Sequence, residues 1–95
     1  MSRDTRSDVL HSADSAINTG RAEVYGEPVD NYRRIGALWT AYLDKRLTSP
    51  LTVADVALMS ALIKAARLTV TPDHRDSWVD LAGYAATGYD AVVSE

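Results

Sequence analysis

The chain has 95 residues, contains no cysteine and carries a formal net charge of −3. This length allows one domain, and the lack of cysteine excludes disulfides and thiolate metal sites. The slightly acidic balance, without any basic run, argues against binding to a DNA or RNA polymer or to an acidic membrane surface. No apolar run approaches the ~20 residues of a membrane span and no signal peptide is visible, so we expect a cytoplasmic protein.

Helix-breaking residues divide the chain into four segments with helical periodicity. The first helix is predicted from about Asp4 to Asn18, with Gly20 as its stop. A connector, Arg21 to Val29, follows. The second helix is predicted to begin with Asp30 as N-cap and to end near Lys45. Its apolar residues step mostly by three and four, which is typical of an amphipathic helix: Tyr32, Ile35, Trp39, Tyr42 and Leu43.

The third helix is predicted from Val53 to Leu68, opened by a capping box of Thr52 and Asp55. It is almost entirely apolar, so we expect it to be buried on most of its circumference.

The fourth helix is predicted to have Thr71 as N-cap and Pro72 at its first position, and to end near Val93. Strand signals are weak throughout the chain. We therefore predict an all-α fold, a compact bundle of about four helices with a buried central third helix. It forms a single helical domain over residues 1–95, with a flexible N-terminus at residues 1–8.

Polar residues interrupt the third helix along one side. Ser60, Lys64 and Arg67 fall within roughly 60° of one another at about 100° per residue. One interpretation is a narrow stripe facing solvent near the end of the helix, where cations are favourable. The other is an anion site, in which Arg67 supplies a planar fork and Lys64 a point charge. The sequence leaves both open.

The fourth helix presents Asp76 and Asp80 one turn apart, with Gly83 farther along the same stripe. The two carboxylates would face solvent, pair with the cations of the third helix, or hold a divalent cation such as Mg²⁺. An internal glycine costs up to ~1 kcal/mol relative to alanine, so Gly83 indicates the close approach of another backbone or of a ligand. Gly88 is interpreted as a sign of fraying near the helix end.

The connector contains groups suited to a nucleotide. Tyr25 would stack on a base and Arg21 would meet a phosphate, while Gly26 would permit a tight turn. The same residues, with Pro28, are also ordinary turn chemistry. The sequence has no His-x-x-x-His, Gly-x-Ser-x-Gly or phosphate-loop pattern, which excludes acyl transfer and P-loop chemistry.

Together these residues resemble a family of small uncharacterised proteins encoded in bacteriophages and in bacterial genomes that carry prophages. The resemblance covers about Arg21 to Ala86. It is carried by the string Arg21…Tyr25-Gly26…Asn31…Ile35…Leu38-Trp39…Tyr42-Leu43…Asp55-Val56-Ala57-Leu58-Met59…Lys64…Ala66-Arg67…Asp76…Asp80…Ala82-Gly83-Tyr84-Ala85.

More distantly, the chain is similar to the all-α NTP pyrophosphatases of the MazG-like group, helical oligomers that hydrolyse nucleoside triphosphates with Mg²⁺. Their sites use a Glu-x-x-Glu pair on one helix and a Glu-x-x-Asp pair on a later one. Here the second helix offers Arg33, Arg34 and Trp39 in place of the first pair. Only Asp76-x-x-x-Asp80 is available for the second. A magnesium site that also uses substrate phosphates needs only two carboxylates, whereas a two-metal clamp is harder to build.

We therefore predict a phage-type helical protein that binds a phosphorylated nucleotide, with cations on the phosphate and an aromatic ring on the base. The predicted ligand-binding residues are Arg21, Tyr25, Asn31, Trp39, Lys64 and Arg67, and the predicted Mg²⁺ ligands are Asp76 and Asp80. Such a protein would act in the host cytoplasm, on nucleotide pools or by sequestering a nucleotide signal of host immunity. A Mg²⁺-dependent pyrophosphohydrolase and a helical interaction protein without a small-molecule ligand are the alternatives, so the sequence does not decide whether the protein is an enzyme.

We also expect a homo-oligomer, at least an isologous dimer. The second and third helices carry more apolar faces than one bundle of this size needs. Gly83 would let a helix of a neighbouring copy come close.

Overall fold

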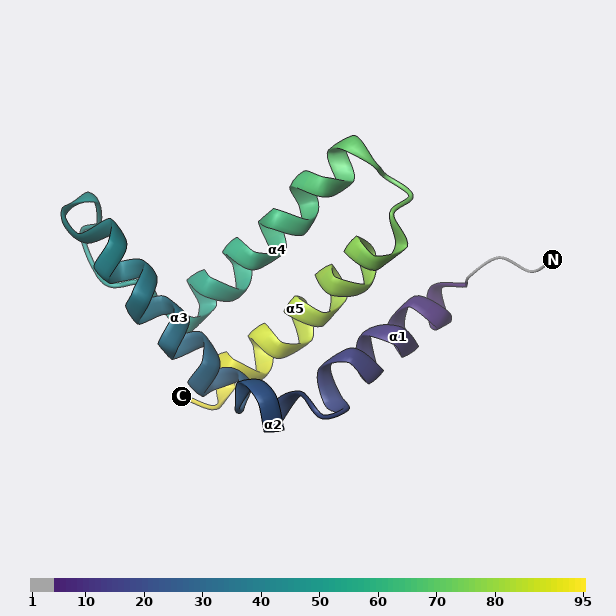
Figure 1. Ribbon diagram of the computed structural model, residues 1–95, viewed down its shortest axis with the longest axis horizontal. Helices are drawn as coiled ribbons and strands as arrows, with labels where there is room; N and C mark the ends of the chain where they lie inside the picture. The colour runs from purple at the N-terminus through teal and green to yellow at the C-terminus, as the bar shows by residue number, and fades with distance from the viewer. Residues whose placement is uncertain (1–4) are drawn as a thin grey trace.

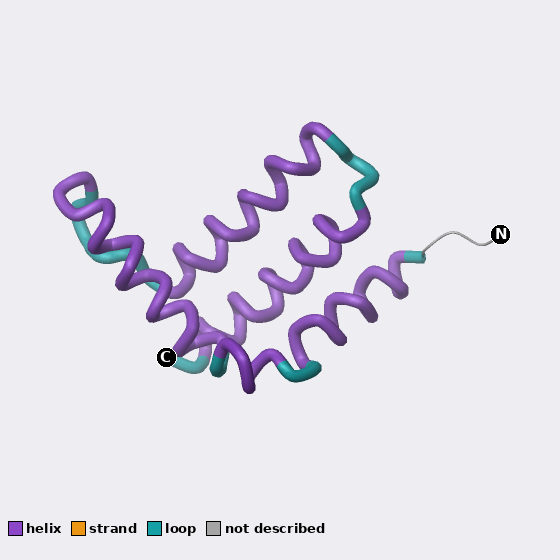
Figure 2. Tube along the Cα trace, in the orientation of Figure 1, coloured by secondary structure: helices purple, strands orange, loops and turns teal. Residues whose placement is uncertain are grey.

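The computed structural model describes residues 5–95 as an arrangement of helices, and no residue in this range lies in a strand (Figures 1 and 2). The elements are α1 (Arg6–Asn18), α2 (Arg21–Tyr25), α3 (Pro28–Leu43), a 3₁₀-helix η1 (Asp44–Arg46), α4 (Val53–Val70) and α5 (Arg75–Val93). The four longer helices, α1, α3, α4 and α5, form a bundle. The all-α prediction is therefore confirmed.

Helices α4 and α5 form an antiparallel hairpin and lie side by side along most of their length (Figure 1). They approach closely at Gly88, where an added Cβ would lie only 2.8 Å from the Cβ of Ala57. Gly88 is buried. The prediction that it marks fraying is wrong, because the missing side chain is what lets the two backbones come together.

Helix α1 lies along α5, on the side away from α4 (Figure 1). An added Cβ at Gly83 would meet Ile17 Cγ2 of α1 at 3.2 Å, and Arg75 Nη2 donates to Ser12 Oγ at 2.9 Å. The close approach expected at Gly83 is thus made by a helix of the same chain. A neighbouring copy is not needed to explain this glycine.

The hydrophobic core lies where α3, α4 and α5 meet. Gly36 lets α3 approach the start of α4, since its added Cβ would be 3.3 Å from both Leu51 O and Val56 Cγ2. Beyond this crossing, the second half of α3 points away from the bundle (Figure 1). The buried residues of the core are Tyr32, Val53, Val56, Ala57 and Ala91.

Two of the predicted helix starts are corrected. Helix α3 begins at Pro28 rather than after Asp30, because proline suits the first helical position. Helix α5 begins at Arg75 with His74 as N-cap, not after Thr71. The backbone N–H of Thr71 instead ends α4 by donating to Arg67 O.

The first turns of α1 and α4 both carry a capping box. In α4, Asp55 N donates to Thr52 Oγ1 at 3.1 Å and Thr52 N donates to Asp55 Oδ2 at 2.9 Å, as predicted. In α1, the backbone N–H and hydroxyl of Thr5 donate to the Asp8 carboxylate and lower its pKa. Of the segment 1–8, expected to be flexible, Arg6–Asp8 thus belong to the first turn of α1; residues 1–4 lie outside the described part.

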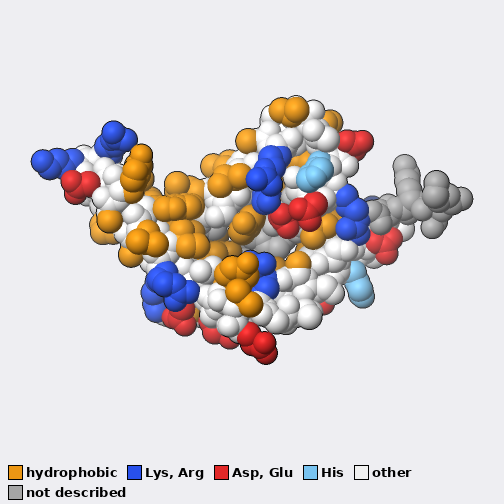
Figure 3. Space-filling view, in the orientation of Figure 1, with side chains coloured by type: hydrophobic (Ala, Val, Ile, Leu, Met, Phe, Trp, Pro, Cys, Tyr) orange, Lys and Arg blue, Asp and Glu red, His pale blue; other side chains and the backbone are white. Residues whose placement is uncertain are grey.

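Helix α4 is central in the sense that it packs against both α3 and α5. Within one chain, however, it does not bury most of its circumference: only Val53, Val56, Ala57 and Leu68 are buried. Apolar side chains on its opposite side are exposed, and Figure 3 shows hydrophobic side chains along α3 and in the angle between α3 and α4. Helices with the length and hydropathy needed to cross a membrane are absent from residues 5–95.

Candidate functional site

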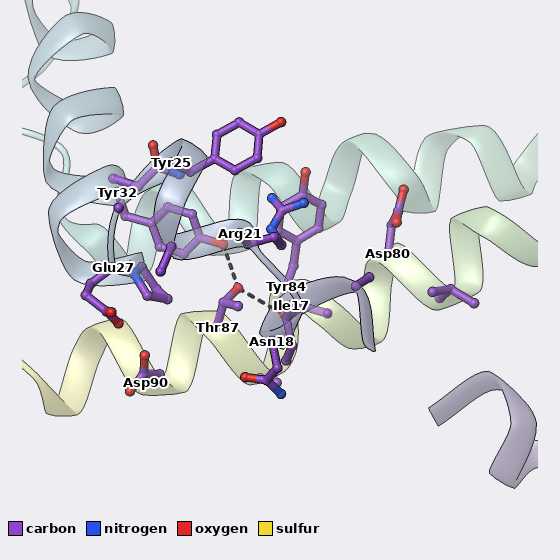
Figure 4. Close-up of a pocket in the computed structure, with 18 residues that line it drawn as sticks. Ile17, Asn18, Arg21, Tyr25, Glu27, Tyr32, Asp80, Tyr84, Thr87 and Asp90 are labelled. Atoms are coloured by element: carbon purple, nitrogen blue, oxygen red, sulfur yellow. Dashed lines mark hydrogen bonds between the residues drawn. The ribbon is translucent and has the colours of Figure 1, made fainter. Parts of the chain in front are cut away.

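A pocket of about 520 Å³ opens between α1, α2, the start of α3 and one side of α5 (Figure 4). It brings together the end of the first helix, the short connector helix and the fourth predicted helix, segments far apart in the sequence. Its chemically distinctive wall residues are Asn18, Arg21, Tyr25, Glu27, Asn31, Tyr32, Asp80, Tyr84, Thr87 and Asp90.

Helix α2 places a cation and an aromatic ring on the pocket wall. Arg21 Cζ lies 4.6 Å from the centre of the Tyr25 ring, a cation–π distance. Glycines at both ends, Gly20 (φ 71°) and Gly26 (φ 78°), adopt positive-φ conformations that let the chain turn into and out of this single helical turn. Arg34 Nη2 of α3 donates to Tyr25 O at 2.8 Å and so fixes the end of α2.

Tyr32 forms the floor of the pocket. Its hydroxyl lies 2.6 Å from Thr87 Oγ1, and Thr87 in turn donates to Gly83 O at 3.0 Å (Figure 4). Since the single hydroxyl proton of Thr87 is used on Gly83, the Tyr32 O–H is the donor to Thr87. Burial raises the pKa of Tyr32, so this phenol stays protonated and the chain of bonds stays intact across the neutral range.

We expect Tyr32→Phe to lower the free energy of unfolding by about 1 kcal/mol, the scale of one hydrogen bond. The raised folded-state pKa also predicts a pH dependence. Tyrosine in the unfolded chain ionises first, near pH 10, so this stabilisation is complete below about pH 10 and is lost as pH rises through the folded pKa. Urea titrations from about pH 8 to about pH 11 should show the wild-type advantage over Tyr32→Phe shrinking. Tyr89→Phe, at an exposed ring on α5, is the matched control, and an equal effect of both changes would contradict the assignment.

Carboxylates occupy the side of the pocket formed by α5 and the start of α3: Asp80, Asp90 and Glu27. Asp80 Oδ2 is paired with Lys64 Nζ of α4 at 2.7 Å. The Lys64 side chain is only 13% exposed and that of Asp80 31%, so the pair sits between α4 and α5 with Asp80 on its pocket side. Of the alternatives that the sequence leaves open for Asp80, pairing with Lys64 is the one observed. Asp80 lines the pocket, whereas Lys64 does not.

The structure brings together half of the residues predicted to bind ligand or metal. Arg21, Tyr25, Asn31 and Asp80 line the pocket. The other four do not: Trp39 packs against the core, Lys64 is paired, and Arg67 and Asp76 are exposed outside it. The polar stripe of α4 and the connector therefore do not form one continuous site.

Sequence reasoning missed Tyr84, Asp90 and Glu27 as wall residues. Tyr84 could have been predicted from the sequence, because it lies one turn after Asp80 on the same side of α5. The contribution of α1 through Ile17 and Asn18 had no local signal, since α1 meets α5 across more than half of the chain.

Comparison with known proteins finds phage relatives. Residues 8–92 match the family described as "Domain of unknown function (DUF6378)". The chain is 44% identical over 77 residues to the Gene 55 protein of Mycobacterium phage L5, covering 81% of this chain and 47% of that protein. It is 39% identical over 77 residues to the Gene 55 protein of Mycobacterium phage D29, covering 81% and 48%. The chain thus spans about half the length of these curated relatives. No solved structure matches it significantly.

Proposed function

The chain belongs to this DUF6378 family, which includes bacteriophage proteins, and we propose that it binds a phosphorylated nucleotide in the pocket between α1, α2, α3 and α5. The observation that carries the proposal is the place of Arg21. Its guanidinium lies over the Tyr25 ring and faces a pocket that also contains Tyr84, two amides and carboxylates (Figure 4). Those groups suit the phosphate, the base and the sugar of a nucleotide.

Each part of the ligand has a suitable counterpart on the wall. Arg21 offers a planar fork of donors to phosphate oxygens. Tyr25 and Tyr84 offer aromatic faces for the base. Asp90 and Glu27 offer acceptors for sugar hydroxyls, since a carboxylate only accepts hydrogen bonds. The volume of about 520 Å³ lies within the range of ligand pockets in proteins.

The charge on the wall favours a nucleotide that brings a cation with it. Three carboxylates face the pocket together with one arginine, and only Asp80 is offset by a lysine behind it. Among residues 5–95, no group of three or more His, Cys, Asp or Glu is placed to hold a metal by itself. Mg²⁺ held jointly by phosphates and one or two carboxylates is a common arrangement. We therefore expect Mg²⁺ to strengthen binding of di- and triphosphates more than of monophosphates.

Binding without turnover is the version of the proposal that we favour. Helix α3 contributes Asn31 and Tyr32 to the wall, and the similarity to MazG-like enzymes would require paired carboxylates on that helix. A protein that holds a nucleotide without hydrolysing it suits sequestration of a nucleotide signal.

Calorimetric titration of nucleoside mono-, di- and triphosphates, with and without Mg²⁺, tests the proposal. We expect at least one nucleotide to bind and Arg21→Gln to weaken it about 10-fold or more, equivalent to about 1.4 kcal/mol. Arg46→Gln is the matched control, because Arg46 is exposed on η1, away from the pocket. Full affinity in Arg21→Gln, or no binding by any nucleotide, would refute the assignment; pyrophosphate release would establish hydrolysis in place of sequestration.

A further inference from the structure

The outward side of α4 is apolar, the reverse of the usual pattern for a helix surface that faces water. Its side chains recur at spacings of three and four residues and fall within roughly 140° of the helix circumference at about 100° per residue. All of them are exposed in a single chain. We call this set the α4 outer face: Leu58, Met59, Leu62, Ile63, Ala66 and Val70.

The charged residues of α4 lie elsewhere. Thr69 is exposed on the same side as the α4 outer face, but its Oγ1 donates to Ala66 O within the helix. Lys64 points to α5 and pairs with Asp80, and Ser60 Oγ donates to Val56 O within the helix. Arg67 is exposed beside the edge of the face. Asp55 precedes the face and belongs to the capping box in the first turn. No charged residue between Leu58 and Val70 therefore lies on the α4 outer face.

The projecting half of α3 also carries exposed apolar side chains. Leu38 and Tyr42 are 70% and 81% exposed. Figure 3 shows hydrophobic side chains continuing from α3 into the angle between α3 and α4. Exposed apolar side chains therefore occur on both of these helices.

The accessible surface area of one chain is larger than expected for a compact monomer of its mass. One chain exposes 6967 Å², whereas a compact monomer of 10.3 kDa exposes roughly 5,400 Å². The surplus, roughly 1,600 Å², exceeds the ~800 Å² that each partner buries in a standard interface. Because the total covers all 95 residues, including residues 1–4, the surplus is an upper limit on the surface that a second copy covers, and it leaves room for an interface of standard size.

We propose that the α4 outer face, with Leu38 and Tyr42 of α3, packs against the same surface of a second copy of this chain. An uncharged face can meet itself about a two-fold axis without placing like charges opposite each other. It offers no charges by which to select a different protein, whereas Arg67 at its edge would lie in a polar rim. The pocket stays open, because it is built from α1, α2, α3 and α5, so the dimer does not depend on the proposed nucleotide.

Sedimentation of the whole chain tests the proposal. At concentrations up to about 100 μM we expect a dimer, and Leu62→Glu should shift it to monomer. Leu10→Glu on α1 is a matched control, since Leu10 and Leu62 are 62% and 66% exposed in a single chain. A wild-type monomer at the highest concentration would overturn the proposal, as would a Leu62→Glu variant that remains a dimer.

A second measurement decides the matter if Leu62→Glu fails to fold. The chain contains no cysteine, so Ala66→Cys and Ala86→Cys each introduce a single thiol at a position exposed in one chain. In the dimer, the thiol at position 66 should react with a maleimide about 10-fold more slowly than the thiol at position 86. Equal rates at dimer-forming concentrations would show that the α4 outer face is uncovered and would overturn the proposal.

Discussion

Gly88→Ala is expected to lower the free energy of unfolding by about 1–2 kcal/mol, because overpacking a tight contact costs up to about 3 kcal/mol and the helix propensity of alanine offsets part of that cost. The added Cβ would lie 2.8 Å from the Cβ of Ala57, and both atoms are attached directly to helix backbones. No flexible side chain can move aside, so α4 and α5 must separate. Alanine gains up to ~1 kcal/mol in helix propensity over glycine, but this gain is smaller than the expected packing loss. At about 4–8 °C per kcal/mol, the change is readily seen in thermal melts followed by circular dichroism.

Two comparisons isolate the contact. Gly83→Ala should be milder, because its Cβ would meet only the end of the Ile17 side chain at 3.2 Å. Adding Ala57→Gly to Gly88→Ala should recover part of the loss, since it removes the opposing Cβ. All variants need the same protein concentration, because stability depends on concentration when copies associate. If the double variant merely shows the sum of the two single losses, the close approach of α4 and α5 at this point is not the cause.

Lys64→Met is expected to destabilise the ligand-free protein by about 2 kcal/mol. This is less than the 3–5 kcal/mol for breaking a fully buried ion pair, because Asp80 keeps some access to water. The substitution preserves much of the apolar stem but strands the Asp80 carboxylate between α4 and α5. It also makes the pocket more negative, so any anionic ligand should bind more weakly even though Lys64 does not line the wall.

A double-mutant cycle with Asp80→Asn tests this interpretation. If the two side chains act as a pair, the double variant should be more stable than the sum of the single losses predicts. Lys45→Met on the exposed η1 is the control for losing a lysine elsewhere. An apo Lys64→Met protein as stable as wild type would contradict the structural pairing and would restore Lys64 as a free cation for a ligand.

Local sequence signals predicted what is decided locally. The Thr52 and Asp55 capping box depends only on a four-residue stretch, and it forms as expected. The start of α5 was missed although Thr71 and Pro72 carry the usual signal, because Thr71 is already used to end α4. A helix hairpin needs residues to reverse direction, and residues 71–74 serve that purpose. Competition between two helices for one residue is invisible when each helix is considered alone.

The faces of the helices were harder to interpret than their ends. Apolar periodicity predicts that a face is buried, but it does not say whether the same chain or another molecule covers it. For α4, the near-continuous apolar sequence predicted burial on most of the circumference, whereas only four of its residues are buried in one chain. For a similar reason, only half of the residues predicted to bind ligand or metal line the pocket. Arg21 and Tyr25 lie one turn apart on one short helix, so their proximity is a local property. That they line the same pocket as Asp80 and Tyr84 depends on how α2 and α5 are placed in the fold.

The pairing of the first long helix with the last has a consequence for synthesis on the ribosome. Helix α1 packs against α5, and the Tyr32 hydroxyl forms a hydrogen bond with Thr87, which lies 55 residues later in the chain. When α1 and α3 leave the exit tunnel, the surface that receives them has not yet been translated. The α4–α5 hairpin is rich in contacts between nearby residues and can form quickly, whereas the long-range contacts must wait. The bundle can therefore be completed only after α5 has emerged from the ribosome.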